Sequence, residues 1–313
     1  MKIALTGANG FIGRHVLQQA EEEGCEIIAM TRRNDASDTH QITWCHCDLV
    51  SSPQEFLDEF IDGCDVVIHT AGEITNIPLM HDLHVKGTRK LISSAKGRVQ
   101  HWVQLSSCGV YGPVRSGVVR EDHPLAPVGC YEETKELSER LVLQAAEQGY
   151  FSATVLRPSI VYGADMPNNS LRSLITMIVH GLFFYIGPAG ATYNCIHVDD
   201  VARAIVSSAV GTHSQREVFN LSNRHTIEEL VSIINKLTGT TSANLRVPEY
   251  LAHVLANSLG RLPGFPLPPS RVDALSSRAS YSDALIRSET GWAPERSLEA
   301  GLQSLVQQMG ILK

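Results

Sequence analysis

Tyr131 and Lys135 are the two side chains whose types and spacing first suggest chemistry. They stand four residues apart at the start of a segment with helical spacing, so they share one face of a helix. A phenol with a pKa of about 10 exchanges protons poorly at neutral pH, and a neighbouring ammonium group stabilises the phenolate. The pair is therefore a candidate for general acid–base chemistry in which Lys135 lowers the pKa of Tyr131.

Three glycines near the start of the chain form a second candidate site. Gly7, Gly10 and Gly13 lie in TGANGFIG, between a strand-like apolar run and a segment with helical spacing. In this context the first glycine permits a tight turn, the second lets the backbone approach a pyrophosphate, and the third lets helix and strand pack closely. The helix start then offers unpaired N–H groups to the phosphates. The pattern predicts that residues 7–13 bind a dinucleotide.

The residues that would meet the adenosine ribose lie about 20 positions after such a loop, at the end of the second strand. Thr31, Arg32 and Arg33 occupy this place. An acidic residue there is typical of NAD binding, whereas arginine can hold the 2′-phosphate of NADP. We therefore expect NADP, with NAD as the alternative. Asp35 or Asp38 could bring a carboxylate to the ribose instead, and two arginines also suit a solvated loop.

The segments that must position these groups alternate between strands and helices. Strands are expected at Lys2–Thr6, Cys25–Met30, Ile42–Cys47, Asp65–His69, Gln100–Ser106 and Ser152–Leu156. Helices are expected at Phe11–Glu23, Pro53–Ile61, Met80–Ala95, Tyr131–Glu147, Val198–Val210 and Thr226–Leu237. The alternation predicts an α/β fold with a Rossmann-type doubly wound parallel sheet, which binds ligands at the carboxyl ends of its strands.

The length of the chain and the loosening of this pattern in its second half suggest two unequal parts. With 313 residues, the chain is long for one domain and short for two independent ones. We expect a dinucleotide-binding domain over residues 1–160, to which residues 195–222 return. Residues 161–313 would mainly form a smaller C-terminal α/β substrate lobe, with prolines clustered at Pro263–Pro269.

Composition and charge exclude several classes of partner. The formal charge of −7 comes without a basic block, so neither nucleic acid nor an anionic membrane is expected to bind. No apolar run reaches the roughly 18 residues that cross a bilayer, and no signal peptide is expected. Seven scattered cysteines favour a reducing, cytoplasmic location. Cys45 and Cys47 flank His46, but alternate residues of a strand face opposite sides, so no metal site is expected.

Five motifs, in order, resemble those of the extended short-chain dehydrogenases/reductases, which include nucleotide-sugar epimerases, dehydratases and 4-ketoreductases. They are TGANGFIG, LSSCGVYG at Leu105–Gly112, YEETK at Tyr131–Lys135, LRPSIVYG at Leu156–Gly163 and IHVDDVARA at Ile196–Ala204. The C-terminal GWAPERSLEAGL also resembles the ending of that family, so the resemblance covers nearly the whole chain. It implies a Rossmann fold, a nicotinamide cofactor and enzyme activity.

The resemblance also implies roles for single residues. Ser107 matches the catalytic Ser/Thr that bonds the substrate oxygen, Tyr131 matches the residue that passes the proton, and Lys135 matches its partner. Cofactor contacts are implied for Gly7, Asn9, Gly10, Phe11, Ile12, Gly13, Thr31, Arg32, Arg33, Asp48, Leu49, Thr70, Ala71, Gly72, His84, Ser106, Tyr131, Lys135, Pro158 and Ser159. Substrate contacts are expected from Cys108, Asn168, Asn169 and Tyr193.

Some of these positions have a more specific expected place. Asp48 would lie beside the adenine, Ala71 under the cofactor diphosphate and Ser159 near the nicotinamide amide. His84, in HVKGT, stands where the family usually has Asn, and it either holds a loop or relays a proton. Tyr193 stands where many nucleotide-sugar enzymes have an arginine for the substrate diphosphate, a charge that Arg172 or Arg287 could supply instead.

Three functions remain open at this point. The first is a ketoreductase that consumes NADPH and acts on a nucleotide-linked sugar, and the second is a nucleotide-sugar 4-epimerase with tightly bound NAD. The third is a non-enzymatic NAD(P) sensor, which would not need Ser107, Tyr131 and Lys135. Sugar 4,6-dehydratases carry an Asp-Glu pair after the catalytic Thr, whereas Cys108 and Gly109 stand here, so dehydration is not expected. For Cys108, packing is the alternative to substrate contact.

The resemblance further implies a homodimer through the helix that carries Tyr131 and the neighbouring helix near Met80–Ala95. Leu137, Leu141 and Ala145 would form an apolar stripe on the first of these helices. Burial of the stripe against the sheet explains the same pattern.

Overall fold

The main sheet has seven parallel strands. The computed structural model describes residues 1–33, 37–211, 216–241, 244–259 and 269–312. The strands of this sheet are β1 (Lys2–Thr6), β2 (Glu26–Thr31), β3 (Ile42–His46), β4 (Val66–His69), β5 (His101–Leu105), β7 (Ser152–Pro158) and β11 (Arg216–Leu221). Their order is β11-β7-β5-β4-β1-β2-β3. The order of the strands reverses between β1 and β4, because β2 and β3 lie on one side of β1 and the later strands lie on the other. Ligands bind at such a switch point.

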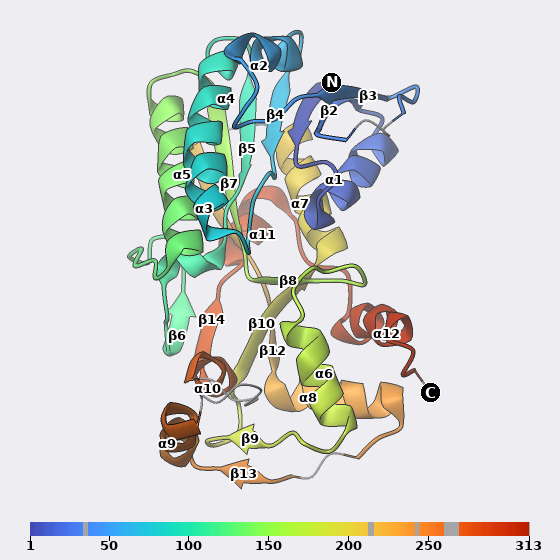
Figure 1. Cartoon of the computed structure of the whole chain (residues 1–313), viewed down its shortest axis with the longest axis vertical. Coiled ribbons are helices and arrows are strands. Elements are labelled where there is room, and N and C mark those ends of the chain that lie inside the picture. Colours follow the sequence, from blue (N-terminus) through green and yellow to red (C-terminus); the bar gives the residue numbers. More distant parts are fainter. Residues whose placement is uncertain (34–36, 212–215, 242–243, 260–268, 313) are drawn as a thin grey trace.

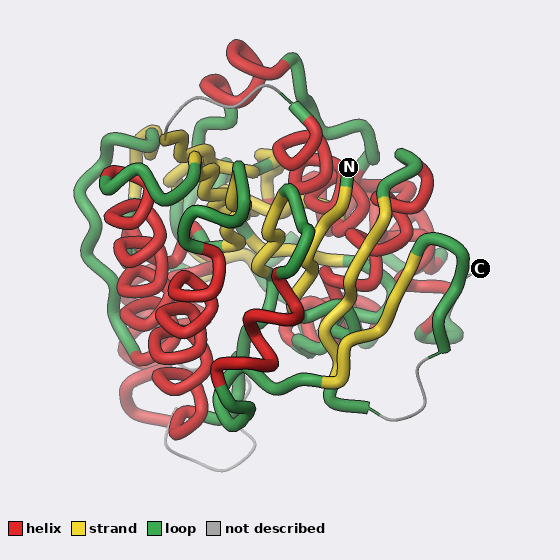
Figure 2. Tube along the Cα trace, turned by 90° about the horizontal axis from the view of Figure 1, so that it is seen from above, coloured by secondary structure: helices red, strands yellow, loops and turns green. Residues whose placement is uncertain are grey.

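Helices cover both faces of this sheet, which is the doubly wound arrangement that the sequence predicts (Figures 1 and 2). One face carries α1 (Phe11–Glu22), α7 (Val198–Val210) and α11 (Ala284–Thr290). The other face carries α2 (Gln54–Ile61), α4 (Thr88–Ala95) and α5 (Cys130–Glu147), with α3 (Ile77–His81) beside α5. The expected fold class is therefore confirmed.

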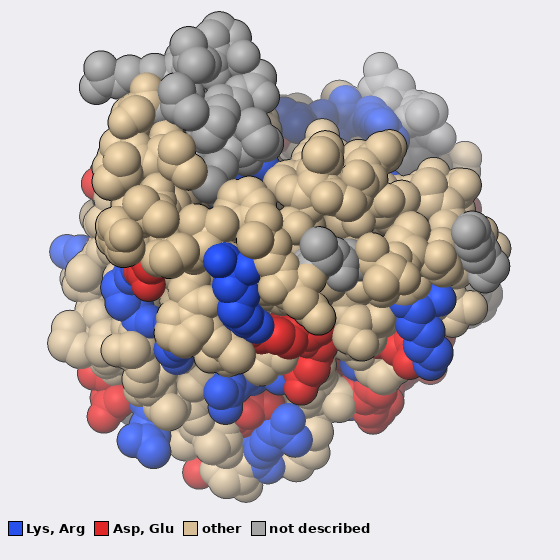
Figure 3. Space-filling view, turned by 90° about the horizontal axis from the view of Figure 1, so that it is seen from below, with Lys and Arg blue, Asp and Glu red and all other residues tan. Residues whose placement is uncertain are grey.

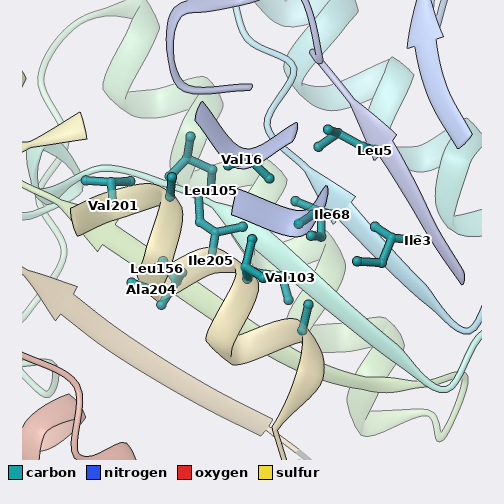
Figure 4. Close-up of a cluster of buried hydrophobic side chains, with 14 of the residues drawn as sticks. Ile3, Leu5, Val16, Ile68, Val103, Leu105, Leu156, Val201, Ala204 and Ile205 are labelled. Atoms are coloured by element: carbon teal, nitrogen blue, oxygen red, sulfur yellow. The ribbon is translucent and has the colours of Figure 1, made fainter. Parts of the chain in front are cut away.

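Alternating apolar positions on the central strands build the core under α1 and α7. Ile3 and Leu5 of β1 point to this side, where they meet Val16 of α1 and Val201 and Ile205 of α7 (Figure 4). Ala4, between them in sequence, belongs to the cluster on the opposite face. This is the period of two that a strand buried on both faces requires.

The second half of the chain forms a smaller lobe at the carboxyl ends of the strands (Figure 1). Its three-stranded sheet has the order β12-β10-β8, and two further strand pairs are β13-β9 and β14-β6. The strands are β6 (Ser116–Val119), β8 (Ile160–Tyr162), β9 (Tyr185–Ile186), β10 (Thr192–His197), β12 (Asn223–Thr226), β13 (Arg246–Val247) and β14 (Arg278–Tyr281). The helices are α6 (Ser170–Val179), α8 (Ile227–Thr238), α9 (Glu249–Leu259), α10 (Pro269–Ser276) and α12 (Leu298–Gln308).

The division between the two parts follows the chain only approximately. Helix α7 and strand β11 join the main sheet, whereas β10, at the start of the returning segment, pairs with β8 and β12 of the lobe. Strand β6 lies within residues 1–160 but pairs with β14 of the second half. Of the expected proline cluster, residues 263–268 lie outside the described part of the chain, as does Asp35.

The prediction of one continuous helix over Met80–Ala95 is wrong in its detail. The structure has α3, then a π-helical segment at Asp82–Gly87, then α4. Gly87 lets this segment approach the loop after β3, because a Cβ there would lie 3.2 Å from the Cβ of Leu49. A π-helical turn carries an extra residue, which changes the direction of the following side chains, and such turns are frequent at functional sites.

Replacement of Ile205 by alanine tests the core of the main sheet. Ile205 is fully buried between α7 and the strands, so Ile205→Ala should lower the free energy of unfolding by about 2–5 kcal/mol. Urea unfolding, followed by circular dichroism, measures this change. The control Val210→Ala, at the 39% exposed end of α7, should cost less than about 1 kcal/mol. Equal losses for the two variants would contradict the described packing.

Candidate active site

The glycine loop brings the end of β1 into contact with the end of β4. Gly7 has a φ of +73°, and a Cβ there would lie 2.7 Å from the backbone nitrogen of Ala71. A Cβ at Gly13 would lie 2.0 Å from the carbonyl oxygen of Gly7, and the Gly10 N–H donates to that oxygen over 2.8 Å. No side chain fits at Gly7 or Gly13. The resulting cradle leaves the N-terminus of α1 open to a phosphate group.

A buried chain of hydrogen bonds lies under this cradle. Thr6 Oγ1 bonds His69 Nδ1 over 2.6 Å, and His69 Nε2 bonds Thr88 Oγ1 over 2.9 Å. Because the Thr88 hydroxyl donates to the carbonyl oxygen of His84 over 2.6 Å, it accepts from Nε2–H of His69. Thr6 also accepts from the N–H of Ala71 over 3.3 Å. Burial lowers the pKa of His69 to about 3, so this imidazole stays neutral.

The end of β2, where the sequence analysis places the adenosine ribose, carries an exposed positive charge. The Asn9 side-chain amide donates to Thr31 Oγ1 over 2.7 Å, which joins the glycine loop to the end of β2. Arg32 is 77% exposed and lies 3.8 Å from an Asp48 carboxylate oxygen. Asp48 itself caps a turn by accepting from the backbone N–H of Ser51 over 2.7 Å. The expected adenine and ribose residues therefore lie together, with the guanidinium group of Arg32 free to turn toward a ligand.

Phe11, Ile12 and Leu49 contribute packing around the loop. Phe11 packs against the lobe core, and its ring would lie 3.2 Å from a Cβ at Gly163. Ile12 packs against the core of the main sheet, and Leu49 is buried in the core on the opposite face. The expected cofactor loop is therefore also a contact between the main sheet and the lobe.

Ser107 and Tyr131 lie beside each other, and Lys135 lies one helical turn after Tyr131 on α5. Ser107 follows β5 and caps a short helical turn by accepting from the N–H of Gly109 over 3.0 Å. Its hydroxyl also hydrogen-bonds the phenol of Tyr131. Lys135 is buried, and its ammonium group donates to the carbonyl oxygen of Leu105 over 2.6 Å.

Burial dominates the pKa of both groups. The pKa of Tyr131 is raised to about 12, because burial and the charge of Glu132 raise it by more than the hydrogen bond from Ser107 lowers it. Tyr131 is therefore a neutral phenol at neutral pH. Burial lowers the pKa of Lys135 to about 8, against the raising effect of Glu139. The lowering of the Tyr131 pKa by Lys135, suggested by the spacing, stays a prediction.

A buried ion pair supports the strand end behind Ser107. The Arg157 guanidinium group bonds both carboxylate oxygens of Glu139, and Ser106 donates to Glu139 over 2.8 Å. Arg157 also donates to the Tyr111 hydroxyl over 2.7 Å. Cys108 is buried beside this pair, and its thiol donates to the carbonyl oxygen of Arg157. Burial raises the pKa of the Cys108 thiol, so the contacts of this residue indicate packing, not substrate binding.

His84 links the loop after β4 to helix α5. Its Nε2 accepts from the N–H of Glu73 over 2.9 Å, and its Nδ1 bonds Thr134 Oγ1 over 2.8 Å. The ring meets Tyr131 edge-on, with centroids 5.8 Å apart. Burial and the charge of Lys135 lower the pKa of His84 to about 3. These contacts fit the loop-holding role better than a proton relay, because an imidazole that stays neutral does not take up a proton.

The residues expected at the nicotinamide lie on adjacent strand ends. Pro158 ends β7, and Ser159 donates its backbone N–H to the carbonyl oxygen of Leu221 over 2.8 Å. The hydroxyl oxygens of Ser159 and Ser222 are buried and have no hydrogen-bond partner among the described residues. An unpartnered buried hydroxyl is a place where a bound polar group can supply the missing hydrogen bond. The glycine cradle and these strand ends therefore fit a nicotinamide dinucleotide.

The expected substrate residues do not all come together. Asn169 borders an open hollow of about 500 Å³ in the lobe, lined also by Arg172, Ser173, Thr176, Met177 and Arg271. Asn168 is exposed and caps the start of α6 by accepting from the Ser170 N–H over 2.7 Å. Tyr193 packs against the lobe core, and Arg287 pairs with Asp283 on α11, away from the hollow. Arg172 is therefore the better placed of the two arginines considered from the sequence.

Several residues of the site escaped the sequence analysis. Thr6 and His69 are polar residues that end otherwise apolar strands, and this position was the available signal. Glu139 lies one helical turn after Lys135, on the same face of α5. No cluster of metal-binding side chains occurs within the described ranges, and Cys45 and Cys47 are free thiols.

Comparison with known proteins places the site in a family. Residues 3–222 match the NAD dependent epimerase/dehydratase family, so the chain belongs to that family. The farnesyl-dihydroquinoline-oxide ketoreductase (4-hydroxy-2-methyl-3-oxo-4-farnesyl-3,4-dihydroquinoline-1-oxide ketoreductase) of Stigmatella aurantiaca is 27% identical, over 98% of this chain and 96% of that protein. The dTDP-6-deoxy-L-talose 4-dehydrogenase (NAD(P)(+)) of Kitasatospora kifunensis is 23% identical, over 97% and 94%.

Solved structures share the fold of the whole chain. The UDP-Glc/GlcNAc 4-epimerase of Campylobacter jejuni superposes with a TM-score of 0.76 at 21% identity, over 99% of each chain. MoeE5 in complex with UDP-glucose and NAD gives a TM-score of 0.75 at 24% identity, over 99% and 98%. The chain is thus an extended short-chain dehydrogenase/reductase with a nicotinamide dinucleotide as cofactor.

The buried histidine of the π-helical segment gives a pH-dependent prediction. The folded-state pKa of His84 is about 3, below the ordinary value of 6.5, so only the unfolded chain takes up this proton between those values. The free energy of unfolding should therefore fall as the pH drops from 6.5, by up to about 1.4 kcal/mol per pH unit from this group.

His84→Gln should show a shallower fall than the wild type in urea titrations between pH 6.5 and 4. His46→Gln, at an exposed position, is the control and should leave the slope unchanged. Parallel curves for the wild type and His84→Gln would disprove the neutral, buried state.

Proposed function

We propose that the protein is an NADP-dependent ketoreductase that reduces a carbonyl group of a nucleotide-linked sugar. The observation that carries this proposal is the neutral phenol of Tyr131 beside the hydroxyl of Ser107. A ketone reductase needs a proton donor next to the carbonyl oxygen, and a phenol with a raised pKa holds that proton at neutral pH. A 4-epimerase would use the same phenol in both directions, first to take a proton and then to return it, and is the alternative.

The residues of the site divide the chemistry among them. A reduced nicotinamide supplies the hydride that adds to the carbonyl carbon. Tyr131 donates its phenolic proton to the carbonyl oxygen as the alcohol forms, and Ser107 donates a hydrogen bond to the same oxygen. Proton transfer of this kind contributes about 10²- to 10⁴-fold to the rate. The ammonium group of Lys135 donates to the carbonyl oxygen of Leu105, which ties the second turn of α5 to the end of β5. The family resemblance implies that the same ammonium group contacts the cofactor ribose.

The preference for NADP is supported by the exposed guanidinium groups at the end of β2. Arg32 and Arg33 both reach solvent, and their only described acidic neighbour in ion-pair distance is Asp48, 3.8 Å from Arg32. A 2′-phosphate would bring a stronger acceptor to the same place. NAD is the alternative, and the structure of MoeE5 is one that contains it.

A nucleotide-linked substrate is supported by the hollow of the lobe. Arg172 and Arg271 line it together with the hydroxyl groups of Ser173 and Thr176. Cationic and hydroxyl groups of this kind bind phosphate oxygens. The lobe face seen in Figure 3 carries positive and negative side chains side by side, so no broad basic patch is visible on this face. This local charge fits a small anionic ligand better than a polyanion.

The same proposal includes a homodimer and a reducing compartment. Ala145 of the expected stripe is buried in the core and Leu141 packs against it, so this stripe lends the α5 interface no support. The seven cysteines are free, which suits the cytoplasm. Among the described residues, no helix has both the length and the apolar character needed to cross a bilayer.

Tyr131→Phe tests the reductase activity. Wild-type protein should oxidise NADPH when a 4-keto-6-deoxy sugar linked to UDP or dTDP is added, as followed by loss of nicotinamide absorbance. The variant should lose at least about 100-fold in turnover, yet bind NADPH within about twofold of the wild type. Tyr250→Phe, at a 67% exposed position, is the control. An epimerase would instead be purified with bound NAD and would leave NADPH unconsumed, and a fully active Tyr131→Phe variant would refute the role of the phenol.

Replacement of both arginines tests the cofactor preference. The double variant Arg32→Ala, Arg33→Ala should bind NADP at least about tenfold more weakly, because it loses charge-assisted hydrogen bonds to the 2′-phosphate, and should bind NAD as before. Fluorescence titration gives both dissociation constants. Arg89→Ala, on the exposed side of α4, should change neither constant. An equal loss for NADP and NAD would show that the arginines do not recognise the 2′-phosphate.

A further inference from the structure

Glu132 has a defined place beside the reacting groups but no task in the chemistry described above. It follows Tyr131 on α5 and is half-buried, whereas the next residue, Glu133, is exposed. Within the described part of the chain, no hydrogen bond or ion pair engages the carboxylate of Glu132. A half-buried carboxylate without a protein partner is able to accept a hydrogen bond from a bound molecule.

The turn after β5 leaves room for this carboxylate. A Cβ at Gly109 would lie 2.9 Å from Cγ of Glu132 and 3.7 Å from its Oε1. The same point lies 3.3 Å from the hydroxyl oxygen of Ser107. A Cβ at Gly129 would lie 3.1 Å from Oε2 of Glu132. Glu132 therefore lies over Gly109, on the side of the turn where the Ser107 hydroxyl lies. Position 109 is the one where dehydratases carry a glutamate of their own, and here a carboxylate reaches it from α5.

The charge of Glu132 also reaches the phenol. It raises the pKa of Tyr131, which is a second sign that the carboxylate faces the reacting groups. The other titratable neighbours of the phenol are His84, whose ring is neutral and edge-on at 5.8 Å, and Lys135 on the next turn of α5. A ligand whose oxygen lies between Ser107 and Tyr131 would thus have a carboxylate at its side.

We propose that Glu132 is a specificity-determining residue that accepts a hydrogen bond from a hydroxyl or ammonium group of the substrate beside the reacting carbon, and that it selects against substrates with a carboxylate there. The proposal rests on the proposed function, because it places the substrate oxygen between Ser107 and Tyr131. A hydroxyl group supplies the partner that the protein does not provide. A second carboxylate would bring two negative charges together in a partly desolvated place.

UDP-glucose and UDP-glucuronic acid form a matched pair for the test, because they differ only in a hydroxymethyl or a carboxylate group on the sugar. Their dissociation constants are measured by calorimetry on the NADP⁺ complexes of the wild type, Glu132→Gln and Glu133→Gln. Wild-type protein and the exposed control Glu133→Gln should bind UDP-glucose at least about tenfold more tightly than UDP-glucuronic acid. In Glu132→Gln the two constants should come within about threefold of each other.

Each outcome decides one of the two proposals. An unchanged ratio in Glu132→Gln overturns the role of Glu132, and an equal change in Glu133→Gln overturns it too, because the effect would then be one of net charge.

If NADP⁺ binds but neither sugar nucleotide binds to any of the three proteins, the substrate class of the proposed function fails. In that case the phenol of Tyr131 is titrated by ultraviolet absorbance against Tyr131→Phe counterparts. A midpoint about one pH unit lower in Glu132→Gln alone supports the placement of the carboxylate, and an unchanged midpoint overturns it.

Discussion

The ion pair between Glu139 and Arg157 holds α5 against the strands that carry the site. Both side chains are almost completely buried, with 2% of Glu139 and 5% of Arg157 exposed. Hydrogen bonds from Ser106 to Glu139 and from Arg157 to Tyr111 extend the pair to both sides of the turn after β5, and the Tyr111 hydroxyl donates to Asn220 of β11. Removal of one partner from such a pair costs about 3–5 kcal/mol, because the other charge is left alone in the core. The helix that carries Tyr131 and the turn that carries Ser107 are thus joined by buried side chains outside the proposed chemistry.

The sequence was informative where a function depends on neighbours in the chain. Gly7 and Gly13 were predictable because each has a local reason, the reversal of the chain after β1 and the close approach of α1. The strands were predictable because both faces of the sheet are covered, which requires continuous apolar runs. Ser107 was a candidate because the family resemblance matches it to a catalytic Ser/Thr, and Lys135 because it lies one helical turn after Tyr131.

The sequence was less informative where a function depends on contacts between distant segments. The π-helical turn around His84 follows from contacts with Glu73 and Thr134, which helical periodicity does not reveal. The spacing of Lys135 also does not reveal that its ammonium group donates to the carbonyl oxygen of Leu105. In the sequence, Gly109 indicated only that the glutamate of the dehydratases is missing. In the structure, the side chain of Glu132 from α5 lies in the space beside Gly109.

The pairing of β6 with β14 has a consequence for the order in which the newly made chain matures. Ser277, which precedes β14, donates to the carbonyl oxygen of Val114, which precedes β6, across 163 residues. A ribosome that adds about 5–20 residues each second needs roughly 8–30 s to supply the missing partner. The last strand of the main sheet, β11, ends at Leu221, well before β14 begins at Arg278. Strand β6 therefore stays without its partner until every strand of the main sheet has been made.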